Sequence, residues 1–364
     1  MKYTSLFVLP ILIGVVSVDA TAMPLTYAGA VSGNNIGAMQ FSLATRAMDS
    51  FKGNELNIVT PRPRPIVQNT TSTDKNSRDL YGTMPMYGTM PVYGEYGDDG
   101  TVFMGRNGGD VPTLDNMWIA WQHYDEYAKF DNLARMDVDY DLVMAGVALG
   151  NLNFMGGTSN WGVFGGYVGH DTDGAPVKVS GDGGYFGIYN GFDAYGAAFD
   201  FVADFGAIGM DAKDGAASDD VSSMWAGLAA NVSYKIMLDD TFALVPGIYG
   251  GYTWIDTDDY TVYGNTVRND ALHMFNVAPG VCAVKHIADG WYGTIGAQYV
   301  FTFTDGGATH APGVKLNELD IDDYSEYGIG LEKSIDKFGF AININRRDGA
   351  RTGWNGGIKV KYVF

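Results

Sequence analysis

The last twelve residues, 353–364, alternate between apolar and polar side chains with a period of two. Trp354, Ile358, Val360, Tyr362 and Phe364 share one face, and Asn355, Gly357, Lys359 and Lys361 share the other. Successive side chains of a strand point to opposite faces, so the segment is predicted to be a strand between an apolar medium and water. A half-buried strand of a soluble sheet alternates in the same way, so the rest of the chain must distinguish the two cases.

The same alternation recurs earlier in the chain, and it sometimes sets carboxylates opposite phenylalanines. Over 290–304 an aromatic and aliphatic face opposes a face of threonine and glutamine. In the segment 337–346 and the residue after it, Phe and Ile oppose Lys, Asn and Arg347. Over 194–209, Phe199, Phe201 and Phe205 oppose Asp200 and Asp204. Carboxylates in this arrangement suit a barrel with a wet interior better than a soluble core.

Twelve segments read as strands, an even number as in bacterial single-chain barrels. They are predicted at about 116–127, 137–149, 161–170, 183–190, 194–209, 221–237, 241–255, 270–284, 290–304, 322–333, 337–346 and 352–364.

The connections between these segments differ in length on the two sides. Most odd-numbered connections are long and polar, and they are 170–182, 210–220, 256–269 and 305–320. Most even-numbered ones are short, namely 191–193, 238–240, 285–289 and 334–336. Long outer loops alternating with short periplasmic turns are typical of outer-membrane barrels. The predicted fold is all-β, an antiparallel transmembrane β-barrel.

Composition agrees with this fold and narrows the function. The 364 residues include 50 Gly, 23 Tyr and 19 Phe, only 18% are charged, and mean hydropathy is −0.05. After the N-terminus no run of 18 apolar residues occurs, which excludes a helical membrane protein. The net charge of −19 argues against nucleic acid as a partner, since phosphate binding needs clustered Lys and Arg.

The N-terminal third is predicted to hold a signal peptide, one helix and a linker. Residues 1–22 have a basic start, an apolar core and an A-x-A cleavage site, which predicts export and a mature chain beginning near Thr21 or Met23. Residues 34–52 are predicted to form a helix capped by Asn34 or Asn35, and 54–112 are predicted to be a linker with a tandem Tyr-Gly-Thr-Met-Pro repeat. The helix residues that define its faces are Asn34, Ile36, Met39, Leu43, Arg46 and Phe51.

Two resemblances follow from these residues. The spacing of Asn355, Gly357, Val360, Tyr362 and Phe364 resembles the C-terminal strand by which the barrel assembly machinery recognises outer-membrane barrels. The order of signal peptide, amphipathic helix and about twelve strands resembles the β-domain of autotransporters (type V secretion). This likeness covers roughly 114–364 and is carried best by Met117-Trp118-Ile119-Ala120-Trp121 and by 354–364.

The autotransporter resemblance implies an outer-membrane protein whose helix threads the lumen and whose upstream passenger is exported. No large passenger is expected between Ala22 and Asn34, and the linker before the first strand is far longer than the family's. Three functions therefore stay open: a translocator or anchor, a porin-like solute channel, and a structural or adhesive surface protein. A channel would have its selectivity set by lumen charges, for which the candidates are Asp200, Asp204, Arg347, Lys359 and Lys361. The helix is predicted to occlude the lumen, with Arg46 meeting Asp200 or Asp204.

No catalytic, cofactor or metal site is predicted. None of the five histidines has a serine two residues away, as outer-membrane phospholipases require, and His170 with Asp171 echoes the omptin proteases only faintly. The acidic loop clusters lack the calcium-loop pattern, and Cys282 lies in an apolar stretch, as an inert buried thiol would. The expected partners are outer-membrane lipid and the barrel assembly machinery, and the sequence does not set the oligomeric state.

Overall fold

The structure is a computed structural model. It describes residues 25–52, 116–130, 133, 135–154, 157–174, 177–194, 197–214, 218–262, 264–288, 290–312, 314–315, 318–319 and 321–364. The predicted signal peptide and the linker with its repeat lie outside these residues. The described N-terminal segment consists of η1 (Leu25–Tyr27) and α2 (Ala28–Lys52).

Twelve antiparallel strands form a closed barrel, because β1 pairs with β17 and β8 pairs with β11. The strands of the first half are β1 (Asn116–Ala128), β2 (Met136–Phe154), β3 (Gly157–Gly174), β4 (Val177–Ala194), β5 (Ala197–Lys213) and β6 (Ser218–Tyr234), which β7 (Ile236–Asp239) continues beyond a bend. The second half contains β8 (Phe242–Thr257), β11 (Leu272–Ala288), β12 (Trp291–Gly306), β15 (Tyr324–Ile335), β16 (Phe338–Gly349) and β17 (Arg351–Val363). Each of the twelve predicted segments corresponds to one of these wall strands.

The two ends of the barrel differ. Asn116 opens β1 opposite Val363 at one end, where the turns between neighbouring strands are short, and we call this the turn end. At the other end, the loop end, β9 (Tyr260–Val262), β10 (Asn265–Asn269), β13 (Thr309–Ala311) and β14 (Val314–Lys315) form a separate four-stranded sheet. Long connections are thus confined to one end, as the sequence predicted.

Two of the predicted long loops are wrong, because strands replace most of 170–182 and 210–220. β3 and β4 pair without a break from Thr158–Asp193 to Gly174–Val177, and β5 and β6 pair as far as Lys213–Ser218. The alternation continues here, but the outward side chains are charged, as in Asp171, Asp173, Asp182 and Asp211. These carboxylates lie where the strands extend beyond the lipid into water. The charged side chains were interpreted as loop residues, so the strands were predicted to be too short.

The helix also begins earlier than predicted, at Ala28 and not at Asn34. Asn34 and Asn35 lie inside the helix and are buried, so neither caps it. Glycine has a low helix propensity, and this segment contains three glycines spaced four residues apart, at Gly29, Gly33 and Gly37. Here Gly33 and Gly37 form the helix face against β8 and β11, where Gly33 lies beside Leu272 and Ile255, and Gly29 lies beside Asn269 of β10. Close approach to the wall therefore overrides the low helix propensity of glycine.

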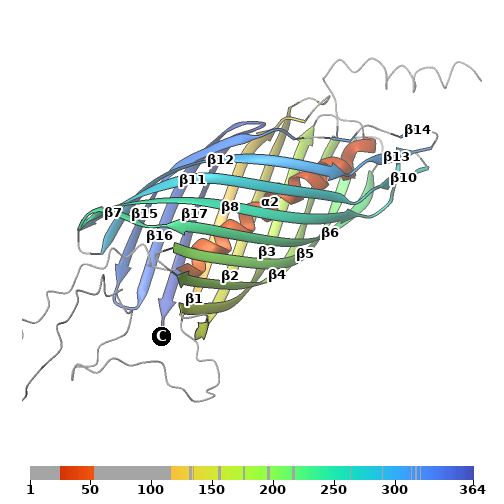
Figure 1. Ribbon diagram of the computed structural model, residues 1–364. Helices are drawn as coiled ribbons and strands as arrows, with labels where there is room; N and C mark the ends of the chain where they lie inside the picture. Colours follow the sequence, from red (N-terminus) through yellow and green to blue (C-terminus); the bar gives the residue numbers. More distant parts are fainter. Residues whose placement is uncertain are drawn as a thin grey trace, which may run out of the picture. The chain divides into compact units, whose positions relative to one another are not determined.

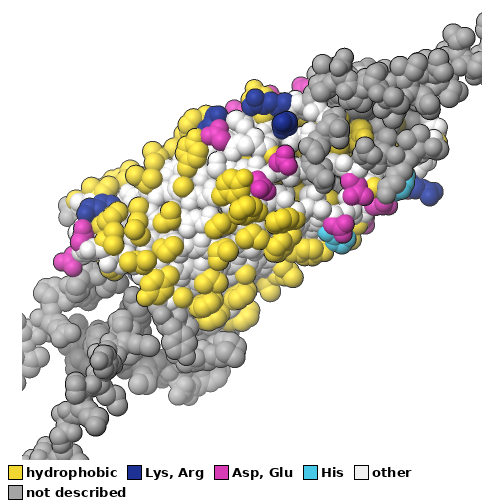
Figure 2. All heavy atoms as spheres, turned by 45° about the horizontal axis from the view of Figure 1, so that its top comes forward, with side chains coloured by type: hydrophobic (Ala, Val, Ile, Leu, Met, Phe, Trp, Pro, Cys, Tyr) yellow, Lys and Arg dark blue, Asp and Glu magenta, His cyan; other side chains and the backbone are white. Residues whose placement is uncertain are grey.

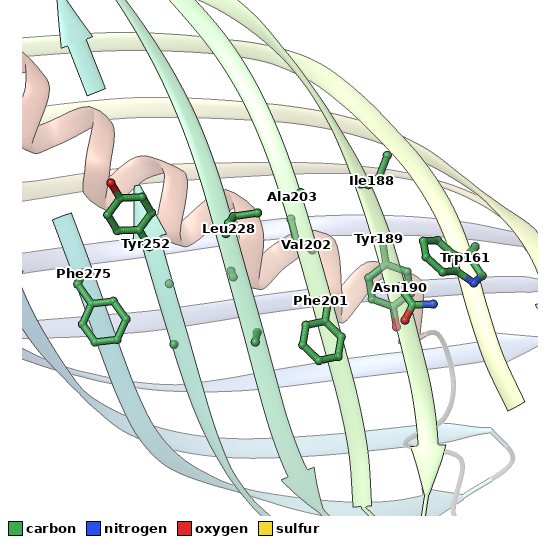
Figure 3. Close-up of a pocket in the computed structure, with 14 residues that line it drawn as sticks. Trp161, Ile188, Tyr189, Asn190, Phe201, Val202, Ala203, Leu228, Tyr252 and Phe275 are labelled. Carbon is green, nitrogen blue, oxygen red and sulfur yellow. The ribbon is translucent and has the colours of Figure 1, made fainter. Parts of the chain in front are cut away.

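Apolar side chains cover the outer wall. Exposed hydrophobic residues occur on every wall strand, including the predicted faces of β12, β16 and β17. Figure 2 shows them over a broad zone of one face, with most charged side chains beyond it. Figure 3 shows a shallow groove in this surface between Trp161, Ile188, Phe201, Leu228 and Phe275. Small side chains such as Ala203 and Ala230 form its floor, so the groove is part of the apolar belt.

Candidate functional site: the plugged lumen

The helix α2 lies inside the barrel and runs along its length (Figure 1). It contacts β1–β6, β8 and β11, and nearly every side chain between Ala28 and Met48 is buried. The predicted helix residues Asn34, Ile36, Met39 and Leu43 are at most 1% exposed, whereas Arg46 is partly exposed. The side chain of Phe51 lies outside the described residues.

The N-terminal end of the helix is held at the loop end. The Tyr260 hydroxyl lies 2.7 Å from the carbonyl oxygen of Thr26 and 3.1 Å from that of Leu25, and the Gly29 N–H donates to it at 3.3 Å. Burial raises the pKa of Tyr260, so the hydroxyl keeps the proton that it donates. Asn34 Nδ2 donates to the Leu319 carbonyl at 3.3 Å, which ties the helix to the connection before β15.

The C-terminal end of the helix points towards the turn end. The ammonium group of Lys359 on β17 donates to the Asp49 carbonyl at 3.2 Å, and the Tyr249 hydroxyl donates to the Asp49 carboxylate at 3.2 Å. Lys359 pairs with Ala120, near the start of β1. The helix therefore leaves the lumen close to the place where the first strand enters the wall.

On one side of the lumen, which we call the aromatic side (β2–β6), large rings fill the space beside inward-facing glycines. The Trp225 ring covers Gly206, and the Phe164 ring covers Gly187. A Cβ atom added at Gly206 would lie 2.1 Å from the Trp225 ring, and one added at Gly187 would lie 2.3 Å from the Phe164 ring. The wet lumen expected from the inward carboxylates is wrong here. The carboxylates are dry and bonded: Asp204 accepts from Trp225 Nε1 at 2.9 Å and Asp200 from the Tyr189 hydroxyl at 3.0 Å.

Gln40 joins the helix to this side. Its Nε2 donates to Asp204 at 2.7 Å, and its Oε1 accepts from the Thr253 hydroxyl of β8 at 2.6 Å. Gly227 makes room for the amide, because a Cβ atom there would lie 2.1 Å from Nε2. The helix contact of Asp204 is thus Gln40 and not the predicted Arg46, whose guanidinium lies 3.3 Å from the Asn345 side-chain amide.

The opposite side, which we call the charged side (β1 and β15–β17), holds a buried ion cluster. Glu126 of β1, 1% exposed, accepts from Arg347 of β16 at 2.9 Å and from Arg351 of β17. Arg347 also donates to Glu326 of β15 at 2.6 Å. Two arginines and two carboxylates balance in charge, which offsets part of the cost of removing them from water.

The ion cluster binds the helix as well as the wall. Arg347 Nη2 donates to Ser42 Oγ at 3.0 Å, and Arg351 Nη2 donates to Asn35 Oδ1 at 2.9 Å. Asn35 Nδ2 in turn donates to Thr172 of β3 at 3.1 Å, so one helix residue spans both sides of the lumen. The two arginines thus connect barrel closure between β1 and β17 with helix docking.

The residues of the predicted assembly signal divide between the two faces of β17. Asn355 faces inward and accepts from Gln122 Nε2 of β1 at 2.9 Å, while Gly357 leaves room for the same glutamine. Val360, Tyr362 and Phe364 belong to the outward face. Of the predicted lumen charges, Asp200, Asp204, Arg347 and Lys361 are at most 7% exposed and face inward, and Lys359 faces inward but is partly exposed.

Comparisons with known proteins identify the family. The sequence model of the autotransporter beta-domain family matches residues 121–345. The chain belongs to the autotransporter β-domain family. No curated protein sequence matches it. The family places the barrel in the bacterial outer membrane, so the turn end is the periplasmic mouth and the loop end is the outer mouth.

Solved structures of autotransporter domains share the fold of this β-domain. The transport unit of AIDA-I from Escherichia coli has a TM-score of 0.60 and 13% identity, with 74% of this chain and 95% of that chain covered. The translocator domain of NalP from Neisseria meningitidis has a TM-score of 0.59 and 11% identity over 69% and 89% of the two chains. The β-domain of the Bordetella autotransporter BrkA has a TM-score of 0.56 and 16% identity, covering 69% of this chain and 100% of that chain.

Sequence reasoning missed several residues that hold this autotransporter plug. Glu126 and Gln122 share the inward face of 116–127 with Asn116, so polar side chains among the apolar ones of this face were the available signal. Gln40 and Ser42 gave no signal, because their partners on β5, β8 and β16 are distant in sequence. In the part of the chain that the structure describes, no helix is long and apolar enough to cross a membrane.

Proposed function

We propose that this β-domain acts as a plugged outer-membrane anchor that holds its N-terminal residues at the outer mouth. The observation that carries the proposal is the direction of α2, which starts beside Tyr260 at the outer mouth and ends near Lys359 at the periplasmic mouth. The helix is held by hydrogen bonds at both ends and by buried contacts on both sides. A tightly held helix suits an anchor better than an open pore, and the role proposed is not catalytic.

The tandem repeat should then be inaccessible from the cell surface of intact cells. The described residues that precede and follow 53–115, Lys52 and Asn116, lie on the side of the periplasmic mouth, and α2 occupies the lumen. A tag placed after Ala22 should be cut by protease added to intact cells. The repeat at 81–92 should be cut only after the outer membrane is permeabilised. Cleavage of the repeat in intact cells would overturn this orientation.

We further propose that β17 is recognised by the barrel assembly machinery. The outward residues Val360, Tyr362 and Phe364 form the apolar face of a strand that also closes the barrel. Deletion of Phe364 or the change Val360→Lys should prevent insertion, since a lysine facing lipid costs up to about 2–4 kcal/mol at the midplane. Lys359→Ala, on the inward face of the same strand, is the control and should insert. Heat-modifiable gel mobility distinguishes the folded variants from the unfolded ones.

A further inference from the structure

Three lysine–aromatic pairs follow one another along the periplasmic end of the wall. The pairs, with the distance between the ammonium nitrogen and the ring centre, are Lys285 with Phe242 at 5.6 Å, Lys333 with Trp291 at 5.2 Å and Lys337 with Tyr362 at 5.9 Å. A cation within about 6 Å of a ring centre is attracted by the π electrons of the ring. The pairs lie on β8 and β11, on β12 and β15, and at β16 and β17, which are consecutive in the wall, and we call this band the basic rim.

Strand register fixes the position of these pairs. Phe242 and Trp291 are the first residues of β8 and β12, and the register sets them directly opposite Lys285 and Lys333. Lys337 lies in the short turn before β16. Directly opposed side chains have their Cβ atoms about 4.5–5.5 Å apart, so a lysine and a ring meet wherever the sequence places them opposite each other. All three lysines therefore lie at the same end of the barrel, next to the periplasmic turns.

The basic rim faces the lipid and not the lumen. Trp291 is 40% exposed, and the neighbouring Ile287 and Ile335 are 60% and 50% exposed. Ile287 lies against the outer wall beside Gly293, where an added Cβ atom would lie 3.3 Å from its Cδ1. A lysine at such a boundary keeps its aliphatic stem on the apolar surface and extends its ammonium group to the level of the lipid head groups.

Lys285 also has contacts with the turn before β8. Its ammonium group donates to the Thr241 hydroxyl at 2.6 Å and lies 3.8 Å from Asp239. The side chains of this ion pair are 51% and 56% exposed, and exposed pairs of this kind are weak and screened by salt. A phosphate group at the membrane surface therefore competes with Asp239 for the same ammonium group.

Another part of the periplasmic end has aromatic rings without lysines. Phe192 of β4 and Phe199 of β5 stack with their ring centres 4.8 Å apart. Among the residues that the structure describes in 116–121, 148–162 and 190–201, at the periplasmic end of β1–β5, there is no lysine or arginine. The basic rim is therefore a property of one part of the wall, and not of every aromatic residue at the membrane boundary.

We propose that the basic rim binds the phosphate groups of anionic phospholipids in the periplasmic leaflet of the outer membrane. The ammonium groups bind the phosphate, and the rings and exposed isoleucines contact the adjoining part of the acyl chains. Basic residues at a membrane surface attract anionic lipid in this way. The formal net charge of −19 would repel such lipids, so a preference for them requires a local basic surface. This interaction adds a lipid preference to the proposed anchor and does not depend on the plug.

The test is the association of spin-labelled lipids with the mature full-length protein in bilayers of zwitterionic lipid at low salt. Phosphatidylglycerol should associate about five-fold more strongly than phosphatidylethanolamine with the same acyl chains, which is the effect of one basic residue at an anionic surface. The preference should fall as salt is added, because salt screens exposed charges. Equal association of the two lipids with the unmodified protein would overturn the proposal.

Variants assign the preference to the basic rim. Lys285→Gln, Lys333→Gln and Lys337→Gln combined should abolish the preference for phosphatidylglycerol, whereas arginine at the same three positions should keep it. Heat-modifiable gel mobility verifies that each variant is folded. If the triple glutamine variant does not fold, Lys337→Gln alone should lower the preference measurably. An unchanged preference in the folded glutamine variant would contradict a role of the basic rim.

The matched control removes three lysines from the outer mouth, Lys129, Lys178 and Lys213. Lys178 and Lys213 are each paired with an aspartate, at 2.9 and 3.0 Å, so a lipid phosphate there would also meet carboxylates. Changing these three lysines to glutamine lowers the positive charge by the same amount and should leave the preference unchanged. An equal loss of preference in this control would mean that total charge, not the basic rim, attracts the lipid, and would overturn the proposal.

Discussion

The two sides of the lumen hold the same helix by different physics. On the aromatic side, rings such as Trp225 fill the space beside glycine, and the fit depends on volume. On the charged side, two arginines that are paired with Glu126 bind the helix through directed hydrogen bonds. Volume complementarity tolerates small shifts of the helix, whereas a buried ion pair does not. We therefore expect the charged side to set the register of the helix in the lumen.

The largest effect is expected on the charged side, from Glu126→Gln. The change leaves Arg347 and Arg351 buried with only Glu326 as a carboxylate partner, and breaking a buried pair in this way costs about 3–5 kcal/mol. The urea midpoint of the folded barrel should fall accordingly. Asp211→Asn removes one partner of the exposed Asp211–Lys213 pair and should cost at most about 1 kcal/mol. Equal losses in the two variants would mean that the ion cluster does not hold the plug.

On the aromatic side, Gly206→Ala should cost about 1–3 kcal/mol by overpacking. The new methyl group would lie 2.1 Å from the Trp225 ring, which cannot move away without losing its bond to Asp204. Gly209→Ala on the same strand meets nothing within 4 Å and is the matched control. Thermal unfolding, followed by gel mobility, should separate the two. Identical midpoints would show that the rings do not fill this side as described.

A smaller effect, about 1–2 kcal/mol, is expected from Gln40→Leu, because Asp204 and Thr253 lose one hydrogen bond each. Trp225 still donates to Asp204, so the carboxylate keeps one partner. The variant should fold and remain plugged, with a modest fall in the urea midpoint. Release of the helix, detected as protease cleavage within 28–52 in the folded barrel, would show that this contact matters more than the ion cluster.

The sequence was sufficient for the strands of the wall, and the family resemblance for a helix in the lumen, but not for the contacts that hold this helix. Each wall strand carries its own signal, since a lipid-facing side chain alternates with an inward one, and Phe338, Phe340 and Ile342 show this without reference to other strands. The inward direction of Asp204 and Arg347 followed from the same pattern. Their partners did not, because those depend on the register of strands far apart in the chain.

The helix shows a second reason for failure. Its first three turns contain Gly29, Gly33 and Gly37, whose low helix propensity argues against a helix, and these glycines are favourable only because they lie close to neighbouring side chains of the barrel. Phe41 lies off the stripe formed by Ile36, Met39 and Leu43, so its contact with Val300 and Tyr324 had no sequence signal. The contacts of such a residue can be recognised only when the structures of both the helix and the facing strands are known.

The most direct test of the central claim, a helix fixed in the lumen, is the conductance of the mature protein with and without residues 25–52. A helix of 25 residues at about 1.5 Å each is about 37 Å long, enough to cross the hydrocarbon core of about 30 Å. The account predicts a small, steady conductance for the mature protein and a large one after deletion, in barrels whose folding is verified by heat-modifiable mobility. Equal, large conductance in both proteins would contradict it and leave an open channel.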